Sequence, residues 1–238
     1  MTFKEIYNIS VPLEKRKEEK YNIWVTIAVR PLSVLLTIPF VSMKVKPLYI
    51  TFVSMVCSII AFFFLSFGSN QQYKLIGWFL FFIWAVFDGV DGNLARCTNQ
   101  CSQLGDLWDT TGGYLAMILM YFSSGIASYF DTNVYNFFET YILIILGGST
   151  ALFSIFPRLV MHKKKSYGNL DNSIKELSDK KEFGLKQIIA MNLVSPSGFL
   201  QIILLLAIIF HYLNVFIIFY FTINFLIMAV SLYKLLKE

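Results

Sequence analysis

The sequence predicts an all-α integral membrane protein with six transmembrane helices, preceded by an N-terminal amphipathic helix in the membrane interface. Of its 238 residues, 56% are hydrophobic and only 15% are charged, whereas soluble domains carry about 25% charged residues. The apolar residues also gather in runs, most of which reach the roughly 20 residues that a helix needs to cross a bilayer once their flanks are counted. These runs are Thr51–Phe67, Leu75–Phe87, Tyr114–Phe130, Thr140–Phe156, Phe199–Leu213 and Val215–Leu232.

The segment before the first run is expected to lie on the membrane rather than across it. Met1–Tyr21 is polar and lacks the apolar stretch of a signal peptide. Trp24–Met43 is apolar, but Arg30, Pro31 and Pro39 interrupt it. A charge at mid-bilayer costs at least about 2.5–3.5 kcal/mol, and a span here would place the basic N-terminal run outside. An amphipathic helix in the interface avoids both problems.

The distribution of positive charge predicts the topology. With six spans and both termini inside, Lys74 is the one residue of the 20 Lys and Arg that falls on the outer side, as the positive-inside rule expects. The net charge of +5 therefore indicates membrane topology rather than binding to nucleic acid. We predict a multi-pass protein of the cell (cytoplasmic) membrane, with the loop from His162 to Ser195 in the cytosol.

The spans are expected to form one domain, residues 1–238, in which residues 1–46 are cytosolic or interfacial and residues 47–234 form the bundle. Between spans four and five, Leu170–Val194 mixes charged and apolar residues at loose helical spacing, which predicts one or two short interfacial helices. Span one begins at Pro47, span two starts at Lys74 and reaches Asp88, span three begins near Gly105, span four ends at Pro157–Arg158, and spans five and six follow Pro196.

Four aspartates are expected to converge at one membrane edge. Asp88 and Asp91 are three residues apart and share one helix face, and Asp106 and Asp109 repeat this spacing on the next helix. The short connection makes the two helices antiparallel neighbours. Carboxylates this close repel one another and are costly to bury, and a divalent cation relieves both problems. Ligation by oxygen alone favours Mg²⁺ or Mn²⁺.

The residues between these aspartates predict a phosphate site. Gly92, Ala95 and Gly105 remove side-chain bulk, so that a ligand can approach closely. Arg96 follows one turn after Asp91 and can donate both arms of its guanidinium to a diphosphate. Carboxylates, a metal ion and an arginine are together typical of phosphoryl transfer.

Each of these residues also has a simpler interpretation. The aspartates can be helix-end carboxylates in water, and Asp106 in particular can be an acid stabilised by the dipole at a helix N-terminus. Arg96 can serve as a cytosolic topology anchor. Arg158 is either an anchor for lipid headgroups or a ligand for the phosphate of an acceptor substrate.

The same stretch resembles the signature of the CDP-alcohol phosphotransferases (CDP-alcohol phosphatidyltransferases), D-x2-D-G-x2-A-R-x8-G-x3-D-x3-D. The residues in register are Asp88, Asp91, Gly92, Ala95, Arg96, Gly105 and Asp109. Two positions depart from the family. Gly113 replaces the last aspartate, a proposed general base or second-metal ligand, and Leu48 replaces the asparagine of the frequent P-N-x-x-T at Pro47–Thr51.

The resemblance implies a role for each matching residue. Asp88, Asp91 and Asp109 would hold the metal ions, Arg96 would steady the donor diphosphate, and Gly92, Ala95 and Gly105 would make room for the cytidine nucleotide. An acceptor hydroxyl would attack the β-phosphorus of the donor, with CMP as the leaving group. Asp109 and Asp106 are the candidate catalytic residues, because Asp106 could replace the carboxylate missing at Gly113.

The expected function is therefore a transferase of phospholipid or related phosphodiester biosynthesis, with its active site facing the cytosol. Its partners would be a CDP-linked donor (CDP-diacylglycerol or a CDP-linked small alcohol), an alcohol acceptor and membrane lipid, and a homodimer is left open. Gly113 leaves a non-catalytic nucleotide- or lipid-binding protein as an alternative. An ion transporter is less favoured, because the acidic residues lie at one membrane edge without a relay through the spans.

Overall fold

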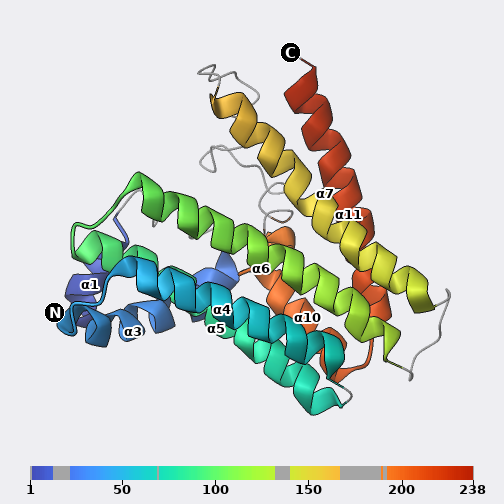
Figure 1. Ribbon diagram of the computed structural model, residues 1–238, viewed down its shortest axis with the longest axis horizontal. Helices are drawn as coiled ribbons and strands as arrows, with labels where there is room; N and C mark the ends of the chain where they lie inside the picture. Colours follow the sequence, from blue (N-terminus) through green and yellow to red (C-terminus); the bar gives the residue numbers. More distant parts are fainter. Residues whose placement is uncertain are drawn as a thin grey trace.

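The computed structural model describes residues 2–12, 22–68, 70–131, 140–166, 189 and 192–237. Every regular element within these ranges is a helix, which confirms the predicted all-α class, and the helices pack into a bundle in which α7 and α11 stand more steeply than α4 and α5 (Figure 1). The elements in chain order are α1 (Phe3–Ser10), the π-helix η1 (Val25–Val29), α3 (Arg30–Ser42), α4 (Pro47–Phe67), α5 (Gln71–Cys97), α6 (Gln103–Tyr129), α7 (Thr140–Ser166), α10 (Phe199–Ile209) and α11 (Leu213–Leu236).

Within the described residues, five helical segments are long and apolar enough to cross a membrane, so the chain is a multi-pass membrane protein. They are Val25–Ser42, Pro47–Phe67, Gln71–Cys97, Tyr141–Lys164 and Leu213–Leu236. Helix α6 is not among them, because serines and glycines on its buried face lower its hydropathy. Helix α10 has only 11 residues, or about 16 Å at 1.5 Å per residue. The predicted fifth span is therefore too short to cross alone, and the count of six spans is not confirmed.

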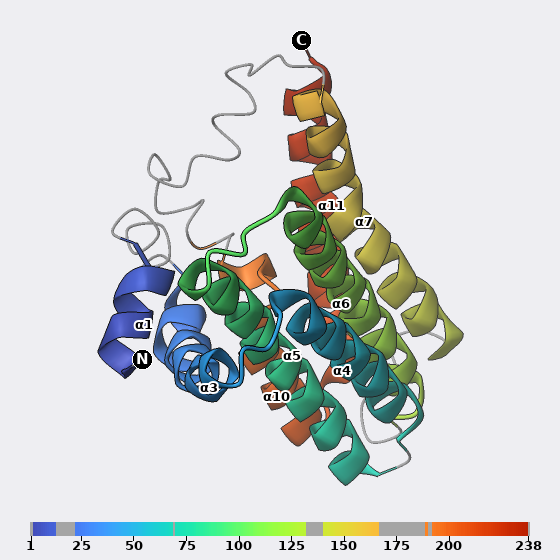
Figure 2. The ribbon, with the colours of Figure 1, turned by 60° about the vertical axis from the view of Figure 1, so that its left-hand side comes forward.

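The apolar segment before the bundle is helical, as predicted, but its interruptions act differently from what the sequence suggested. Pro31 lies in the first turn of α3, where a missing N–H is tolerated. Arg30 is buried, and its Nη1 donates to Asn93 Oδ1 on α5 over 3.0 Å. Its charge therefore does not exclude Val25–Ser42 from the membrane, and by length and composition that segment also qualifies as a span. In Figure 2, α3 is seen nearly along its axis, while α4 and α5 are seen from the side. Helix α3 is therefore steeply inclined to α4 and α5.

The bundle buries polar residues within its apolar core and exposes many large apolar residues on its surface. Ser54, Ser58 and Ser124 are buried between helices, and each hydroxyl donates to a carbonyl of its own helix. Phe52 and Leu152 are instead largely exposed. Such a surface suits contact with lipid, since backbone and hydroxyl groups are satisfied within the protein. The predicted interfacial helices at Leu170–Val194 lie almost entirely outside the described residues.

Two glycines bring α6 and α7 into backbone contact. A Cβ built on Gly125 would lie 2.9 Å from Gly147 Cα, and one built on Gly147 would lie 2.8 Å from Gly125 Cα. Both distances are below any contact that real Cβ atoms make. At the next position, a Cβ on Gly148 would meet only Phe122 Cδ2, at 4.0 Å. The pair is a small-residue crossing of the kind that holds membrane helices together.

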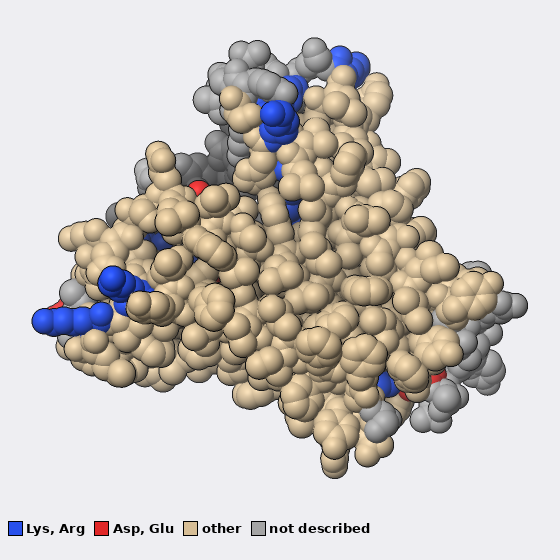
Figure 3. Space-filling view, in the orientation of Figure 1, with Lys and Arg blue, Asp and Glu red and all other residues tan. Residues whose placement is uncertain are grey.

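The end of the bundle away from the acidic motif carries a buried ionic cluster. Lys74 Nζ lies 3.6 Å from Asp131 Oδ2, and His211 Nδ1 lies 3.2 Å from Asp131 Oδ1. The cluster ties the start of α5 to the end of α6 and to the turn between α10 and α11. On the face shown in Figure 3, Lys and Arg gather at the left and upper edges, and one small charged group lies at the lower right. This agrees with the predicted charge asymmetry.

The α6–α7 crossing predicts opposite outcomes for neighbouring substitutions. Gly147→Ala forces the two backbones apart and should destabilise the protein by about 1–3 kcal/mol, the usual cost of overpacking. Gly148→Ala has room for its methyl group and should leave the melting temperature in detergent unchanged or slightly raised, since alanine favours the helix. Equal melting temperatures for the two variants would contradict this packing.

The charge asymmetry predicts which end of the bundle faces the cytosol. In a background where Cys57, Cys97 and Cys101 are replaced by serine, Ser166→Cys should resist a membrane-impermeant maleimide added to intact cells. Asn70→Cys, at the opposite end, should react readily. Both positions are exposed, so access is limited by the membrane alone. Labelling of Ser166→Cys with protection of Asn70→Cys would invert the topology.

Candidate active site

The turn between α5 and α6 brings the two halves of the motif together. Asn99 adopts a left-handed conformation with φ of 54°, which asparagine tolerates better than most residues, and it turns the chain after α5. Ser102 then caps α6, its Oγ accepting from the Gly105 N–H at 3.0 Å. The connection is short, so α5 and α6 run antiparallel from this turn, as the sequence predicts.

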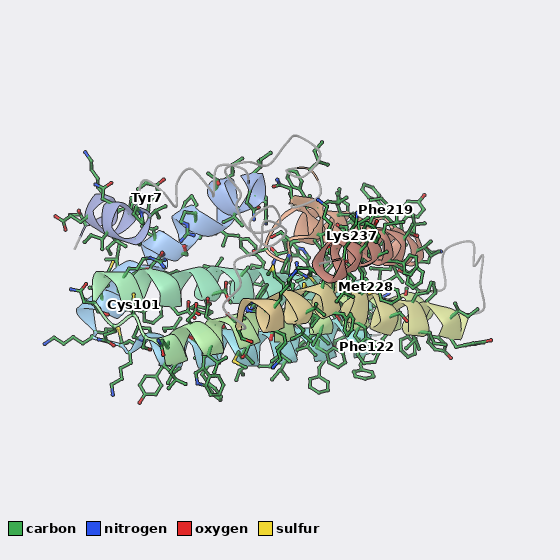
Figure 4. All side chains as sticks on the ribbon, turned by 90° about the horizontal axis from the view of Figure 1, so that it is seen from above. Tyr7, Cys101, Phe122, Phe219, Met228 and Lys237 are labelled. Carbon is green, nitrogen blue, oxygen red and sulfur yellow. The ribbon has the colours of Figure 1, made fainter. Side chains whose placement is uncertain are left out.

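A cavity of about 320 Å³ opens where the start of α4, the end of α5 and the start of α6 meet. Cys101, labelled in Figure 4, lines it and marks this end of the bundle. The predicted residues that line the cavity are Asp91, Gly92, Ala95, Arg96, Gly105, Asp106 and Asp109. The remaining lining residues are Lys46, Pro47, Leu48, Thr51, Gln100, Cys101, Ser102 and Leu104.

Asp91 is the most enclosed carboxylate of the cavity, with 4% of its surface exposed. Its Oδ2 accepts a 2.6 Å hydrogen bond from Thr51 Oγ1 on α4. Its Oδ1 is buried without a hydrogen-bond partner, and the carboxylate of Asp109 is near enough to repel it. The threonine of the Pro47–Thr51 element therefore orients one oxygen of Asp91 and leaves the other for a ligand.

The four motif aspartates are not equivalent. Asp106 and Asp109 are exposed on the first turns of α6 and face the same cavity as Asp91, whereas Asp88 does not line it. Across the ranges that the structure describes, no three His, Cys, Asp or Glu side chains gather closely enough to hold a metal ion. The donor chemistry nevertheless fits a hard divalent cation, since the donors are carboxylate oxygens and Asp91 Oδ1 is buried without a partner.

Arg96 lies along the cavity wall formed by α5. Its Nη2 donates to Asn93 Oδ1 over 3.3 Å. A Cβ on Gly92 would lie 3.1 Å from the same Nη2, so the glycine makes room for the guanidinium. Gly105 has a structural part as well, because a Cβ there would lie 3.2 Å from the capping oxygen of Ser102.

Arg158 and Gly113 lie outside this cavity lining. Arg158, on α7, is largely enclosed, and its Nη1 donates to the Ser154 carbonyl. Its charge acts electrostatically on Tyr114 and Tyr121 of α6. A Cβ on Gly113 would have no other atom within 4 Å. There is therefore space for a side chain at the position where the family signature has its last aspartate.

Sequence reasoning missed Lys46 and Asn93. Lys46 lines the cavity and places a cation at its mouth; the available signal was its position directly before Pro47. Asn93 occupies a position at which the signature allows any residue, so the motif gave no signal for it. Its hydrogen bond to Arg96 follows from their spacing of three residues on one helix.

Comparison with known proteins agrees with this geometry. The searches of the curated proteins and of the solved structures returned no match. The family model of the CDP-alcohol phosphatidyltransferases matches residues 44–233, which include α4 to α10, nearly all of α11 and every residue of the cavity lining. The chain therefore belongs to the CDP-alcohol phosphatidyltransferase family.

Proposed function

We propose that this protein transfers a phosphatidyl or phospho-alcohol group from a CDP-linked donor to an alcohol, with release of CMP, in phospholipid or related phosphodiester synthesis. One observation carries the proposal: six of the seven residues in register with the family signature (Asp91, Gly92, Ala95, Arg96, Gly105 and Asp109) line a single cavity at one end of a membrane bundle. By the charge asymmetry, this end faces the cytosol, where a polar nucleotide donor is available.

The donor diphosphate would bind between two cations. Arg96 lines one wall of the cavity, and Lys46 lines another from the start of α4. Gly92, Ala95 and Gly105 line the cavity without adding a bulky side chain to it. The guanidinium can form paired hydrogen bonds with phosphate oxygens, and the ammonium adds a mobile point charge.

Asp91 and Asp109, with Asp88 from the preceding turn of α5, would hold Mg²⁺ or Mn²⁺. When bound, such an ion neutralises charge on the diphosphate and on the phosphorus under attack. The hydrogen bond from Thr51 keeps Asp91 Oδ2 fixed, so that Oδ1 points to the ligand without a cost in side-chain entropy.

The transfer itself joins the acceptor oxygen to the β-phosphorus and breaks the bond between that phosphorus and the oxygen that leaves with CMP. The acceptor hydroxyl loses its proton in this step. Asp106 lines the cavity on the same helix as Asp109 and can accept that proton in place of the carboxylate missing at Gly113. Arg158 would bind a phosphate of the acceptor, since it is a largely enclosed cation of α7 whose charge is felt by Tyr114, the residue after Gly113.

A non-catalytic nucleotide- or lipid-binding protein is the second candidate function. The observation that favours it is the open space at Gly113, where the family signature has an aspartate. An ion transporter fits less well, because the carboxylates of the cavity lie at one end of the bundle.

The reaction predicts a dependence on divalent cations. Purified protein supplied with a panel of CDP-alcohols and alcohol acceptors should release CMP with Mg²⁺ or Mn²⁺ and stop after chelation. Asp91→Asn should remove most of this activity, because it replaces the anionic oxygen that faces the cavity. Its melting profile should stay close to that of the wild type, since asparagine preserves the acceptor for Thr51. Undiminished CMP release after chelation would contradict the metal assignment.

The substitution at Gly113 predicts a second pair of outcomes. Asp106→Asn should lower turnover by about 10²–10⁴-fold, the usual contribution of a general base, while donor affinity changes little. Gly113→Asp has room for its side chain and should raise turnover in the Asp106→Asn background. Wild-type turnover in Asp106→Asn would show that Asp106 only stabilises the N-terminus of its helix. Absence of CMP release from every donor would favour the non-catalytic binding protein.

A further inference from the structure

A buried polar network joins α3 to the wall of the cavity. Asn93 is fully buried on α5. Its Oδ1 accepts from Arg30 Nη1 at 3.0 Å and from Arg96 Nη2 at 3.3 Å. Its Nδ2 donates to Ser33 Oγ at 3.2 Å and to Thr37 Oγ1 at 3.4 Å. One amide thus contacts two guanidinium groups and two hydroxyls.

The hydroxyls determine which way this amide points. Ser33 Oγ donates to the Arg30 carbonyl at 2.9 Å, and Thr37 Oγ1 donates to the Ser33 carbonyl at 2.7 Å. Each hydroxyl has one proton, so toward Asn93 both can only accept. The amide nitrogen must therefore face α3, and the amide oxygen must face the two guanidinium groups.

The backbone allows this contact only because α5 has a glycine at the crossing. A Cβ on Gly89 would lie 2.8 Å from Ser33 Cβ, so a larger residue there would push α3 away. Arg30 and Arg96 carry like charges, and the amide oxygen between them lowers the cost of holding them near each other. Together with Gly92, which gives the Arg96 guanidinium its space, these contacts determine where that guanidinium lies.

We infer that Asn93 is a positioning residue through which α3 holds the guanidinium of Arg96 in the orientation that binds the donor diphosphate. This inference rests on the proposed function. The residues of α3 precede residue 44, where the family match begins. A helix outside the matched region is thus part of the donor site, although Arg30, Ser33 and Thr37 do not line the cavity.

The test is a double-mutant cycle on the full-length protein. Asn93→Ala should raise the KM for the CDP donor about ten-fold, the loss expected for one hydrogen bond to a charged group, with kcat within about two-fold. In the Arg96→Ala background the same substitution should change KM less than about two-fold, because its effect passes through Arg96. Thr26→Val is the control: it removes a hydrogen-bonding group at an exposed position of η1 that does not line the cavity and should behave as the wild type.

A merely structural role for Asn93 would give a different pattern. It would raise KM by the same factor with and without Arg96, or lower kcat and the melting temperature without changing donor affinity. Either pattern, or a KM for Asn93→Ala equal to that of the wild type, would overturn the inference.

A second measurement separates this inference from the proposed function. Modification of arginines by phenylglyoxal, followed by mass spectrometry, needs no substrate. Asn93→Ala should speed modification of Arg96 several-fold and leave Arg158 unchanged. An unchanged Arg96 rate overturns the positioning role even if CMP is released. A faster rate supports that role even in a protein that releases no CMP, in which case the proposed reaction alone fails.

Discussion

The hydrogen bond from Thr51 to Asp91 joins α4 and α5 at the point where the cavity opens. A carboxylate with 4% of its surface exposed is stable only with a partner for its oxygens. Thr51 provides one such partner from a neighbouring helix, so the position of α4 and the orientation of Asp91 depend on each other. The same need is met two residues further along α5, where the Asn93 side chain accepts hydrogen bonds from Arg30 and Arg96. The site is held by polar contacts between helices.

Small residues make those contacts reachable. Gly89 lets α3 approach α5, and Gly125 with Gly147 lets α6 approach α7. Membrane helices cannot rely on the hydrophobic effect to bring them together, so close backbone contact and satisfied hydroxyls take its place. The serines inside the bundle follow the same rule. The buried face of α6, the helix that carries Asp106 and Asp109, is accordingly rich in serine and glycine.

The apolar runs predicted most helices because lipid-facing residues dominate their composition, and the motif spacing predicted the cavity because α5 and α6 meet at a short turn. The prediction was weaker where tertiary contacts override composition. Arg30 looked like a barrier to burial, but Asn93 satisfies it, and the run before His211 looked like a full span but ends after 11 helical residues. Two residues of the site were missed. Lys46 lines the cavity from its position just before α4, and Asn93 acts from a buried face of α5 through its hydrogen bond to Arg96. Asp88 matched the signature but does not line the cavity.

The ionic cluster of Lys74, Asp131 and His211 makes the two ends of the bundle unequal. At one end the helices spread around an open hollow, and at the other three helix ends are drawn together by buried charge. Polar substrates of the proposed reaction would therefore enter and leave at the end that carries the cavity. In the proposed reaction, the nucleotide would leave on the side from which the donor entered, and a lipid product would move sideways between helices into the bilayer. The cavity thus opens at one end of the bundle, whereas a channel would have to open at both ends.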